Sequence, residues 1–449
     1  MKVKPEFVYV KETIPIEVEE GSILNISTKE VTSFTHGFHK YPAKFIPHLP
    51  KWAISKYLNG FENKTILEPF CGSGTTLVEG ILAGHNVIGF DVDPLSVLIS
   101  KVKITRIDVP TLDIICDWLI KNIKRKRNGN FKPACENLKH WFTEDAIRKL
   151  SLIRGLIDQI QVRFGSEKEI KDIVDLLIIC FSSIIRRVSN ADNESQKTYV
   201  SHTKLKMPEE VNNLFFQQLV LFFDRIRLFT DIVNPNLHSK VVCTSSNVFL
   251  LDKLEGHNID LVITSPPYIK SIDYIYNQMA ELFWVGDLFD MQTQDKQNGK
   301  KREYIGNKHL SKVEFKHYTP INTPFGIESL DKKLQIVFNS DKKNGHKHSY
   351  ITYKYFLEME KHFKEMSKCL TVGTPYIVII GDSKVSGTYF DTANIVIEIA
   401  RRNGFKLINK WGYKIKNRYM RFDRKGRGGI IEIDWVLELE KQIEMSLID

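Results

Sequence analysis

The chain has 449 residues, of which 42% are hydrophobic, and a formal net charge of +10. That length can bury a large core and predicts two or three structural units. The excess of basic over acidic residues favours polyanionic partners, of which nucleic acid is the first candidate. The charged N-terminus lacks a signal-peptide core, and the most apolar run, residues 173–185, is too short to span a bilayer. We therefore expect a cytoplasmic protein without a membrane partner.

The cysteines indicate neither a disulfide framework nor a metal site. No two of the six form a Cys-x-x-Cys pair, and no Cys/His cluster has zinc spacing. We expect reduced, mostly buried thiols, as is typical of a cytoplasmic protein, and no bound metal.

Helix and strand patterns alternate along residues 52–105. Apolar strand patterns at 65–70 and 86–92 are separated by a helical pattern and flanked by two more. This is a βαβ unit, which predicts a parallel sheet with right-handed crossovers. From about residue 111 to 235 the apolar spacing is almost entirely helical, interrupted by a polar stretch at 189–204. The pattern predicts a large helical insertion.

Strand patterns return at 239–246 and 259–265, followed by a polar, irregular region at 283–348. The chain ends with a strand at 375–382, a helix, and two strand-like runs that flank a basic loop. These last runs predict an antiparallel hairpin at the sheet edge. We divide the chain into residues 30–108, the insertion 109–236, and residues 237–440.

A glycine turn, Glu68-Pro69-Phe70-Cys71-Gly72-Ser73-Gly74-Thr75, joins the first strand to its helix. Glycines let the backbone turn sharply and let a ligand approach closely, and the N–H groups of such a turn face the carboxyl edge of the strand. The turn lacks the GxGxxG register of a dinucleotide site and the GKS or GKT of a P-loop. A phosphate ligand is therefore disfavoured.

An acid follows the second strand about twenty residues later. A carboxylate at this place can hold both ribose hydroxyls. Asp91 follows the strand directly, so we assign the ribose to it, whereas Asp93 precedes Pro94 and suits a helix N-cap. A nucleoside ligand without a phosphate anchor points to S-adenosylmethionine.

The strand at 259–265 ends in Ser265-Pro266-Pro267-Tyr268. This segment alone is equally well explained as a strand stopped by a proline turn. Sheet topology, however, places it at the ligand crevice beside the glycine turn. There the Ser265 oxygen and the Pro266 carbonyl can accept hydrogen bonds from the amino group of a base and free its lone pair. The prolines fix the backbone, and Tyr268 offers a face for an extruded base.

The two turns together resemble the amino-group DNA methyltransferases, in which an FxGxG turn binds S-adenosylmethionine and a [D/N/S]PPY turn carries catalysis. The resemblance covers most of the chain and implies a Rossmann-like methyltransferase sheet. The serine form of the second turn goes mostly with N4-cytosine methylation in that family. The resemblance implies the catalytic residues Ser265, Pro266, Pro267 and Tyr268, and cofactor contacts from Glu68, Phe70, Gly72, Gly74, Thr75, Asp91 and Thr264.

Supporting segments lie outside the two turns. Residues 36–45 resemble the family segment that closes over the methionine part of the cofactor, with Tyr41 and Lys44 as contacts, although a proline-ordered loop explains them too. Ser246 and Asn247 follow the third strand, where many relatives carry an acid near the adenine. We include both in the cofactor site, as candidate acceptors for the adenine amino group. Gly381-Asp382-Ser383 is either a pocket wall or an ordinary turn.

Basic residues suggest where nucleic acid binds. The loop after residue 415 is the densest basic and aromatic one, and it suits either DNA phosphates or a solvated hairpin tip. Its candidate contacts are Arg418, Arg421, Arg424 and Arg427. Arg186 and Arg187 are further candidates because they end a buried helix at a polar loop. For target recognition, the insertion and the region 283–348 remain alternatives.

These features predict a DNA methyltransferase that flips a base out of a specific duplex sequence and methylates cytosine N4. Resemblance implies a restriction-modification system with a cognate restriction endonuclease. The alternatives are an N6-adenine DNA enzyme, an RNA base amino-methyltransferase, and a nucleic-acid-binding protein that keeps the fold without activity.

Overall fold

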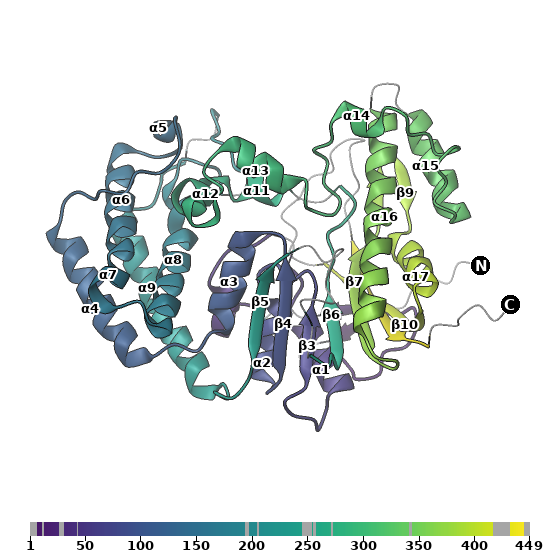
Figure 1. Ribbon diagram of the computed structural model, residues 1–449, viewed down its shortest axis with the longest axis horizontal. Helices are drawn as coiled ribbons and strands as arrows, with labels where there is room; N and C mark the ends of the chain where they lie inside the picture. The colour runs from purple at the N-terminus through teal and green to yellow at the C-terminus, as the bar shows by residue number, and fades with distance from the viewer. Residues whose placement is uncertain are drawn as a thin grey trace.

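A nine-stranded sheet runs through the molecule, with helices on both faces and a helical lobe beyond one edge (Figure 1). This computed structural model describes residues 7–10, 13–26, 31–42, 44–193, 197–203, 206–244, 254, 257–270, 273–340, 344–415 and 432–443. The α/β class predicted from the sequence is confirmed, because most neighbouring strands of the sheet are parallel.

Five parallel strands form the half of the sheet that carries the predicted motifs. Their order is β7-β6-β3-β4-β5, so the chain leaves β3 toward β4 and returns on the other side of β3 as β6. The carboxyl ends of all five meet at one edge, and the topological switch point lies between β3 and β6. The strands are Thr65–Glu68 (β3), Asn86–Asp91 (β4), Ser239–Cys243 (β5), Leu261–Thr264 (β6) and Pro375–Gly381 (β7).

The predicted C-terminal hairpin is present, but it does not form the sheet edge. β10 (Phe405–Lys414) pairs antiparallel with β11 (Ile433–Lys441), and β11 pairs antiparallel with β7. Two N-terminal strands, β2 (Ile23–Ile26) and β1 (Phe7–Val10), continue the sheet beyond β10. The prediction that the hairpin lies at the sheet edge is therefore wrong. The sequence does not indicate β1 and β2, because each is only four residues long and carries little periodic signal. A separate two-stranded sheet is formed by Ser383–Val385 (β8) and Thr388–Phe390 (β9).

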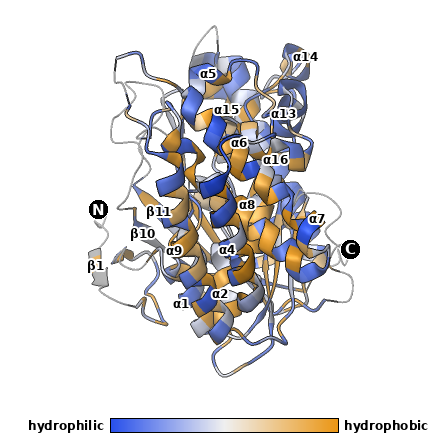
Figure 2. Ribbon diagram, turned by 90° about the vertical axis from the view of Figure 1, so that its left-hand side faces the viewer, coloured by the Kyte–Doolittle hydropathy of each residue, from blue (hydrophilic) through white to orange (hydrophobic). Residues whose placement is uncertain are grey.

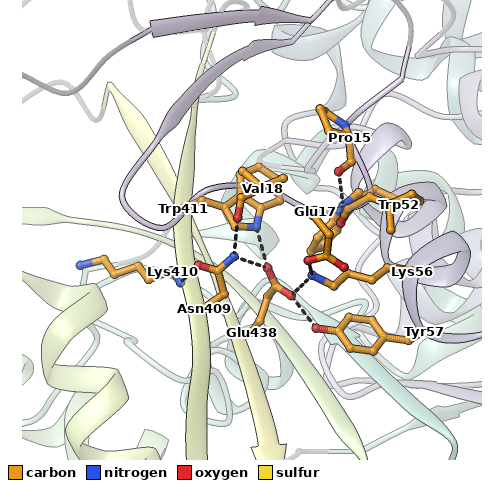
Figure 3. A network of polar contacts seen from close by, with 11 residues as sticks. Pro15, Glu17, Val18, Trp52, Lys56, Tyr57, Asn409, Lys410, Trp411 and Glu438 are labelled. Carbon is orange, nitrogen blue, oxygen red and sulfur yellow. Dashed lines mark hydrogen bonds and ion pairs between the residues drawn. The ribbon is translucent and has the colours of Figure 1, made fainter.

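A buried carboxylate fastens the hairpin to the N-terminal segment (Figure 3). Glu438, on β11, contacts Tyr57 Oη at 2.5 Å, Trp411 Nε1 at 3.0 Å, Lys56 Nζ at 3.0 Å and Asn409 Nδ2 at 3.1 Å. Asn409 and Trp52 donate in turn to the carbonyls of Val18 and Pro15. A buried charge is tolerated only when its lone pairs are satisfied in this way, so the network holds the N-terminal segment against the sheet.

Each face of the sheet has its own core. α1 (His48–Tyr57), α2 (Thr75–Leu82) and α3 (Pro94–Ile104) cover one face. α15 (Glu328–Ser340), α16 (Gly345–Cys369) and α17 (Thr392–Arg402) cover the other. Adjacent residues of β3 point to opposite cores, Ile66 to the first and Leu67 to the second, as the alternation of a strand requires.

The predicted insertion forms the helical lobe. Its core is continuous with that of the α1–α3 face, because α8 packs on α3 and its apolar run is buried as predicted. The hydropathy colouring shows apolar residues along α8 and α9 (Figure 2). The lobe contains Val109–Arg125 (α4), Leu138–Trp141 (α5), Glu144–Asp158 (α6), Ile160–Phe164 (α7), Lys168–Val188 (α8) and Val211–Ile232 (α9).

The region after the serine-proline turn is more helical than the sequence indicates. It contains Tyr274–Asn277 (α11), Met279–Val285 (α12), Gly286–Phe289 (η2), Gln294–Lys301 (α13), Lys312–Phe315 (α14) and α15. Most of these helices are too short to show an apolar period, and α13 buries no residue. α15 is the exception, because its buried residues Leu330, Leu334 and Val337 have helical spacing. Within the described ranges, no helix combines the length and apolar character needed to cross a bilayer.

Candidate functional site

The turns after β3 and β6 open into one cavity at the carboxyl edge of the sheet. Polar and aromatic side chains line it together, as is common in small-molecule sites. Many of the residues predicted for the site line it: Tyr41, Lys44, Glu68, Phe70, Gly72, Thr75, Asp91, Ser265 and Pro267. The two predicted motifs, almost two hundred residues apart, therefore meet because β3 and β6 are neighbours.

The glycine turn has a backbone that side chains would disturb. Gly72 has φ +47°, and a Cβ there would lie 3.1 Å from Tyr41 Cε1. Gly74 has φ +75° and begins α2, and its Cβ would lie 2.9 Å from Ser100 Oγ. Gly72 therefore shapes the cavity wall, whereas Gly74 lets the turn pack on α3 and does not line the cavity.

Asp91 ties the end of β4 to the glycine turn. Its carboxylate accepts from Gly72 N–H and from Asp93 N–H, both at 2.8 Å. Burial, followed by the charge of Asp93, raises the pKa of Asp91 to about 7. Asp93 caps α3 by accepting from Leu95 N–H and Ser96 N–H, as the sequence predicts. Asp91 thus faces the cavity with acceptor capacity left, because a carboxylate has about four lone-pair sites.

A buried polar cluster stands behind the methionine end predicted for the cofactor. Lys44 lines the cavity and donates to the His36 carbonyl at 3.1 Å, while His36 Nε2 hydrogen-bonds to Glu79 at 2.7 Å. Lys103, fully buried, donates to the Ser73 carbonyl at 2.8 Å. Burial lowers the pKa of both lysines, and an anion beside them would raise it again.

One wall of the cavity consists of stacked aromatic rings, and no sequence motif predicts it. Tyr274 stacks on Tyr41 at 5.7 Å and on Tyr304 at 5.9 Å, with interplanar angles of 20° and 15°. All three rings line the cavity. Tyr274 and Tyr304 come from the region after the serine-proline turn, so only their aromatic character could have marked them.

The serine-proline turn, Ser265-Pro266-Pro267-Tyr268, divides its residues between the cavity and the sheet. Ser265 and Pro267 line the cavity, whereas Pro266 is buried. Tyr268 does not line the cavity; its hydroxyl donates to Asp434 Oδ1 at 2.5 Å. Thr264, the last residue of β6, is buried outside the cavity lining.

The other predicted contacts fall into two groups. Ser246, Asn247, Arg418, Arg421, Arg424 and Arg427 lie outside the described residues. Arg186 and Arg187 order the polar loop after α8 instead of facing the cavity: Arg186 donates to the carbonyls of Asp192 and Lys197, and Arg187 pairs with Glu209. Asp382 accepts from Trp435 and Tyr389, which fits an ordinary turn.

Comparison with known proteins adds an independent line of support. Residues 11–101 match the family model described as DNA methylase. The Type II methyltransferase M.MvaI of Kocuria varians is 27% identical over 416 residues, covering 88% of this chain and 87% of the relative. The Type II methyltransferase M.MjaII of Methanocaldococcus jannaschii is 37% identical over 135 residues, covering 28% and 25%. These matches support the DNA methylase family.

They also support a DNA methyltransferase with S-adenosylmethionine as its cofactor. The rRNA methyltransferase aviRa of Streptomyces viridochromogenes aligns over 89% of this chain and 88% of its own at 11% identity, with a TM-score of 0.29. A TM-score this low adds nothing to the fold, which rests on the strand order above.

The cavity has the chemistry that this cofactor requires. Two buried polar atoms on its wall, Glu68 Oε2 and Ser73 Oγ, have no hydrogen-bond partner in the described part of the protein. Buried polar atoms are normally paired, so orphans on a cavity wall fit a polar ligand. Burial raises the pKa of Glu68, and an ammonium group beside it would reverse that shift.

Proposed function

We propose that this protein transfers a methyl group from S-adenosylmethionine to the N4 amino group of cytosine in duplex DNA, after flipping the base out of the helix. The observation that carries the proposal is the shared cavity of the two turns after β3 and β6. One turn suits the cofactor and the other suits an amino group. The reaction needs both ligands side by side, and adjacent parallel strands supply that arrangement.

The cofactor site divides by chemistry. Asp91 accepts from the ribose hydroxyls, Lys44 faces the carboxylate of the methionine part, and Glu68 accepts from its ammonium group. The stacked tyrosines supply an apolar, electron-rich wall. When bound, the cofactor supplies an activated methyl group on a sulfonium.

The catalytic turn prepares the nucleophile. An exocyclic amino group is a poor nucleophile because its lone pair is delocalised into the ring. The Ser265 oxygen and the Pro266 carbonyl accept hydrogen bonds from its two protons and favour the tetrahedral nitrogen. Tyr268 stacks on the flipped base and fixes its plane. Alignment of nitrogen and methyl group supplies much of the remaining rate.

Cytosine N4 is preferred to adenine N6 because this chain carries serine where the related adenine enzymes mostly carry Asp or Asn. The similarity to Type II methyltransferases supports a restriction-modification role with a cognate endonuclease, and a protein with that role is expected in the cytoplasm. We assign target recognition to the lobe 109–236 or to the region 283–348, on either side of the catalytic turn in the sequence. Residues 30–108 and 237–440 then form the methyltransferase domain.

Product analysis tests the proposal. Purified protein is incubated with labelled S-adenosylmethionine and, separately, with unmethylated genomic DNA and total RNA, which are then digested to nucleosides for mass spectrometry. We expect N4-methylcytosine in DNA. N6-methyladenine would keep the mechanism but reject the base, label only in RNA would reject the substrate, and no label with either would reject the activity.

A further inference from the structure

Asp434 connects the C-terminal hairpin to the catalytic turn. It is the second residue of β11 and pairs with Gly381, the last residue of β7, because the two strands are antiparallel. It also lies opposite Tyr413 of β10. This register brings the beginning of β11 to the carboxyl edge of the parallel strands, where the turn after β6 lies. The carboxylate accepts from Tyr268 Oη at 2.5 Å and from Tyr413 Oη at 2.9 Å.

Burying this carboxylate costs free energy. Asp434 is 7% exposed, and burial raises its pKa. The hydrogen bonds found for its side chain come from two neutral phenols and from no lysine or arginine in the described part of the chain. A well-packed apolar residue at such a position is often as stable or more stable. The two hydrogen bonds offset part of this cost, and they fix where the Tyr268 and Tyr413 hydroxyls lie.

We propose that Asp434 is a positioning residue that holds the ring of Tyr268 in the plane needed to stack on the flipped base. The proposal rests on the catalytic role of the turn proposed above. Tyr268 is joined to β6 through two prolines that fix the backbone, so the remaining freedom of its ring lies in the side-chain torsions. A hydrogen bond at the far end of the ring removes that freedom before the base arrives, which lowers the entropy lost on binding.

In the hydrogen bond between the two side chains, Tyr268 is the donor and Asp434 is the acceptor. Burial, followed by the charge of Asp434, raises the pKa of Tyr268 well above its usual value, so the phenol remains a donor at any working pH. Asp434 can only accept when ionised, and a second donor, Tyr413, holds its other oxygen. The two phenols thus donate to different oxygens of the carboxylate, so the bond to Tyr268 does not use the oxygen that Tyr413 occupies.

Tyr413 provides a matched control within the same site. It donates to the same carboxylate and is also buried, but it belongs to β10 and its ring packs in the core of the α1–α3 face. Tyr413→Phe therefore removes an equivalent hydrogen bond without touching the catalytic turn. The comparison separates loss of a buried hydrogen bond from loss of the tie to Tyr268.

The test uses the full chain as wild type, Tyr268→Phe, Asp434→Leu, Tyr413→Phe and the double variant Tyr268→Phe/Asp434→Leu; leucine has a similar volume and no acceptor, whereas an asparagine would keep one. Mapping the methylated bases of treated genomic DNA gives the target sequence for a duplex oligonucleotide. For each protein, kcat and KM on this duplex, the Kd of S-adenosylmethionine, and the emission of 2-aminopurine at the target base are measured. The emission reports how the flipped base stacks.

We expect Tyr268→Phe and Asp434→Leu to lower kcat by about five- to tenfold, the loss expected for one buried hydrogen bond. Both should change the 2-aminopurine emission and leave the cofactor Kd within about twofold of wild type. The double variant should be no slower than the slower single variant, because both remove one interaction. Tyr413→Phe should keep the wild-type emission.

The outcomes separate the two proposals. An active wild type whose Tyr268→Phe variant matches Tyr413→Phe in kcat and emission would overturn the positioning role alone. A wild type that methylates no nucleic acid would overturn the proposed function, and the positioning role with it. If Asp434→Leu fails to fold, Tyr268→Phe decides, because it removes one hydroxyl and leaves the hairpin intact.

Discussion

Asp91 Oδ2 accepts a hydrogen bond from the backbone N–H of Gly72 at 2.8 Å, so the acid after the second strand is fastened to the glycine turn after the first. The group proposed to hold the ribose and the turn proposed to hold the methionine part are therefore one unit. A change in the charge of Asp91 should affect the cofactor more than it affects the fold, because a neutral amide can still accept from Gly72.

Asp91→Asn should raise the Kd of S-adenosylmethionine by about tenfold, since hydrogen bonds to a charged group contribute about 1.5–3 kcal/mol and an amide oxygen retains part of this. Isothermal titration calorimetry at pH 8 measures the effect. The control is Asp93→Ala, which removes the N-cap of α3 and should cost about 1 kcal/mol of unfolding free energy. Unchanged cofactor affinity in Asp91→Asn would show that the ribose is held elsewhere.

Cofactor binding should also depend on pH. The pKa of Asp91 is raised to about 7 from its usual 3.8, so its protonation stabilises the folded protein fully below pH 3.8, and this contribution is lost as the pH rises through about 7. Ribose hydroxyls favour the ionised form. Below about pH 7, binding therefore releases a proton, and the Kd should fall by up to about tenfold for each unit that the pH rises, before levelling off.

Titrations between about pH 5.5 and 8.5 measure this profile, with Asp91 as the group assigned to it. Asp91→Asn is the control, because an amide does not titrate and the slope from this residue should vanish. A wild-type slope that survives in Asp91→Asn would assign the titration to another group at the site, such as Glu68, whose pKa is also raised by burial.

Gly72→Ala should weaken cofactor binding and destabilise the fold. The backbone at φ +47° costs a residue with a Cβ about 1–2 kcal/mol, and the new methyl group would press on Tyr41. Gly60 is a matched control because it has φ +78° and no atom within 4 Å of the place that a Cβ would take, so Gly60→Ala carries the backbone cost alone. The midpoint of thermal unfolding should drop in both variants, and the cofactor Kd should rise only in Gly72→Ala.

Ser265→Ala should lower kcat by about tenfold or more while leaving the cofactor Kd within about twofold, since the serine oxygen is proposed to contact the amino group and not the cofactor. Single-turnover methylation of duplex DNA measures the chemical step directly. An equal loss in cofactor affinity would instead make Ser265 part of the cofactor site, whose cavity wall it shares.

Local patterns in the sequence predict the parts of the site that depend on consecutive residues. The glycine turn, Asp91 and the serine-proline turn each follow a buried strand, and parallel pairing then brings them together. The same logic predicts the parallel pairing of β3 with β4 and of β4 with β5. The N-cap role of Asp93 also follows from its position before Pro94.

Contacts between distant segments have no such signal. The Tyr268–Asp434 bond joins residues 166 positions apart, and His36 meets Glu79 across 43 positions. Neither partner belongs to a pattern that the other completes, so only the sheet register and loop packing reveal them. The sequence indicates that Arg186 is available to nucleic acid, yet its guanidinium is used on backbone carbonyls, because burial near a loop requires those carbonyls to be satisfied.

The stacked tyrosines of the cavity wall are expected to contribute to cofactor binding. Tyr304 forms the outer end of the ring stack and lines the cavity, so Tyr304→Ala should open the wall and raise the cofactor Kd by about three- to tenfold, the value of one ring contact of about 0.5–1.5 kcal/mol. Tyr350→Ala is the control, because Tyr350 also packs against other rings, Tyr318 and Phe315, but does not line the cavity. Calorimetry on both variants distinguishes a wall that contacts the cofactor from one that only covers it: equal Kd values in the two would show that the rings stabilise the region after the catalytic turn and contribute nothing to binding.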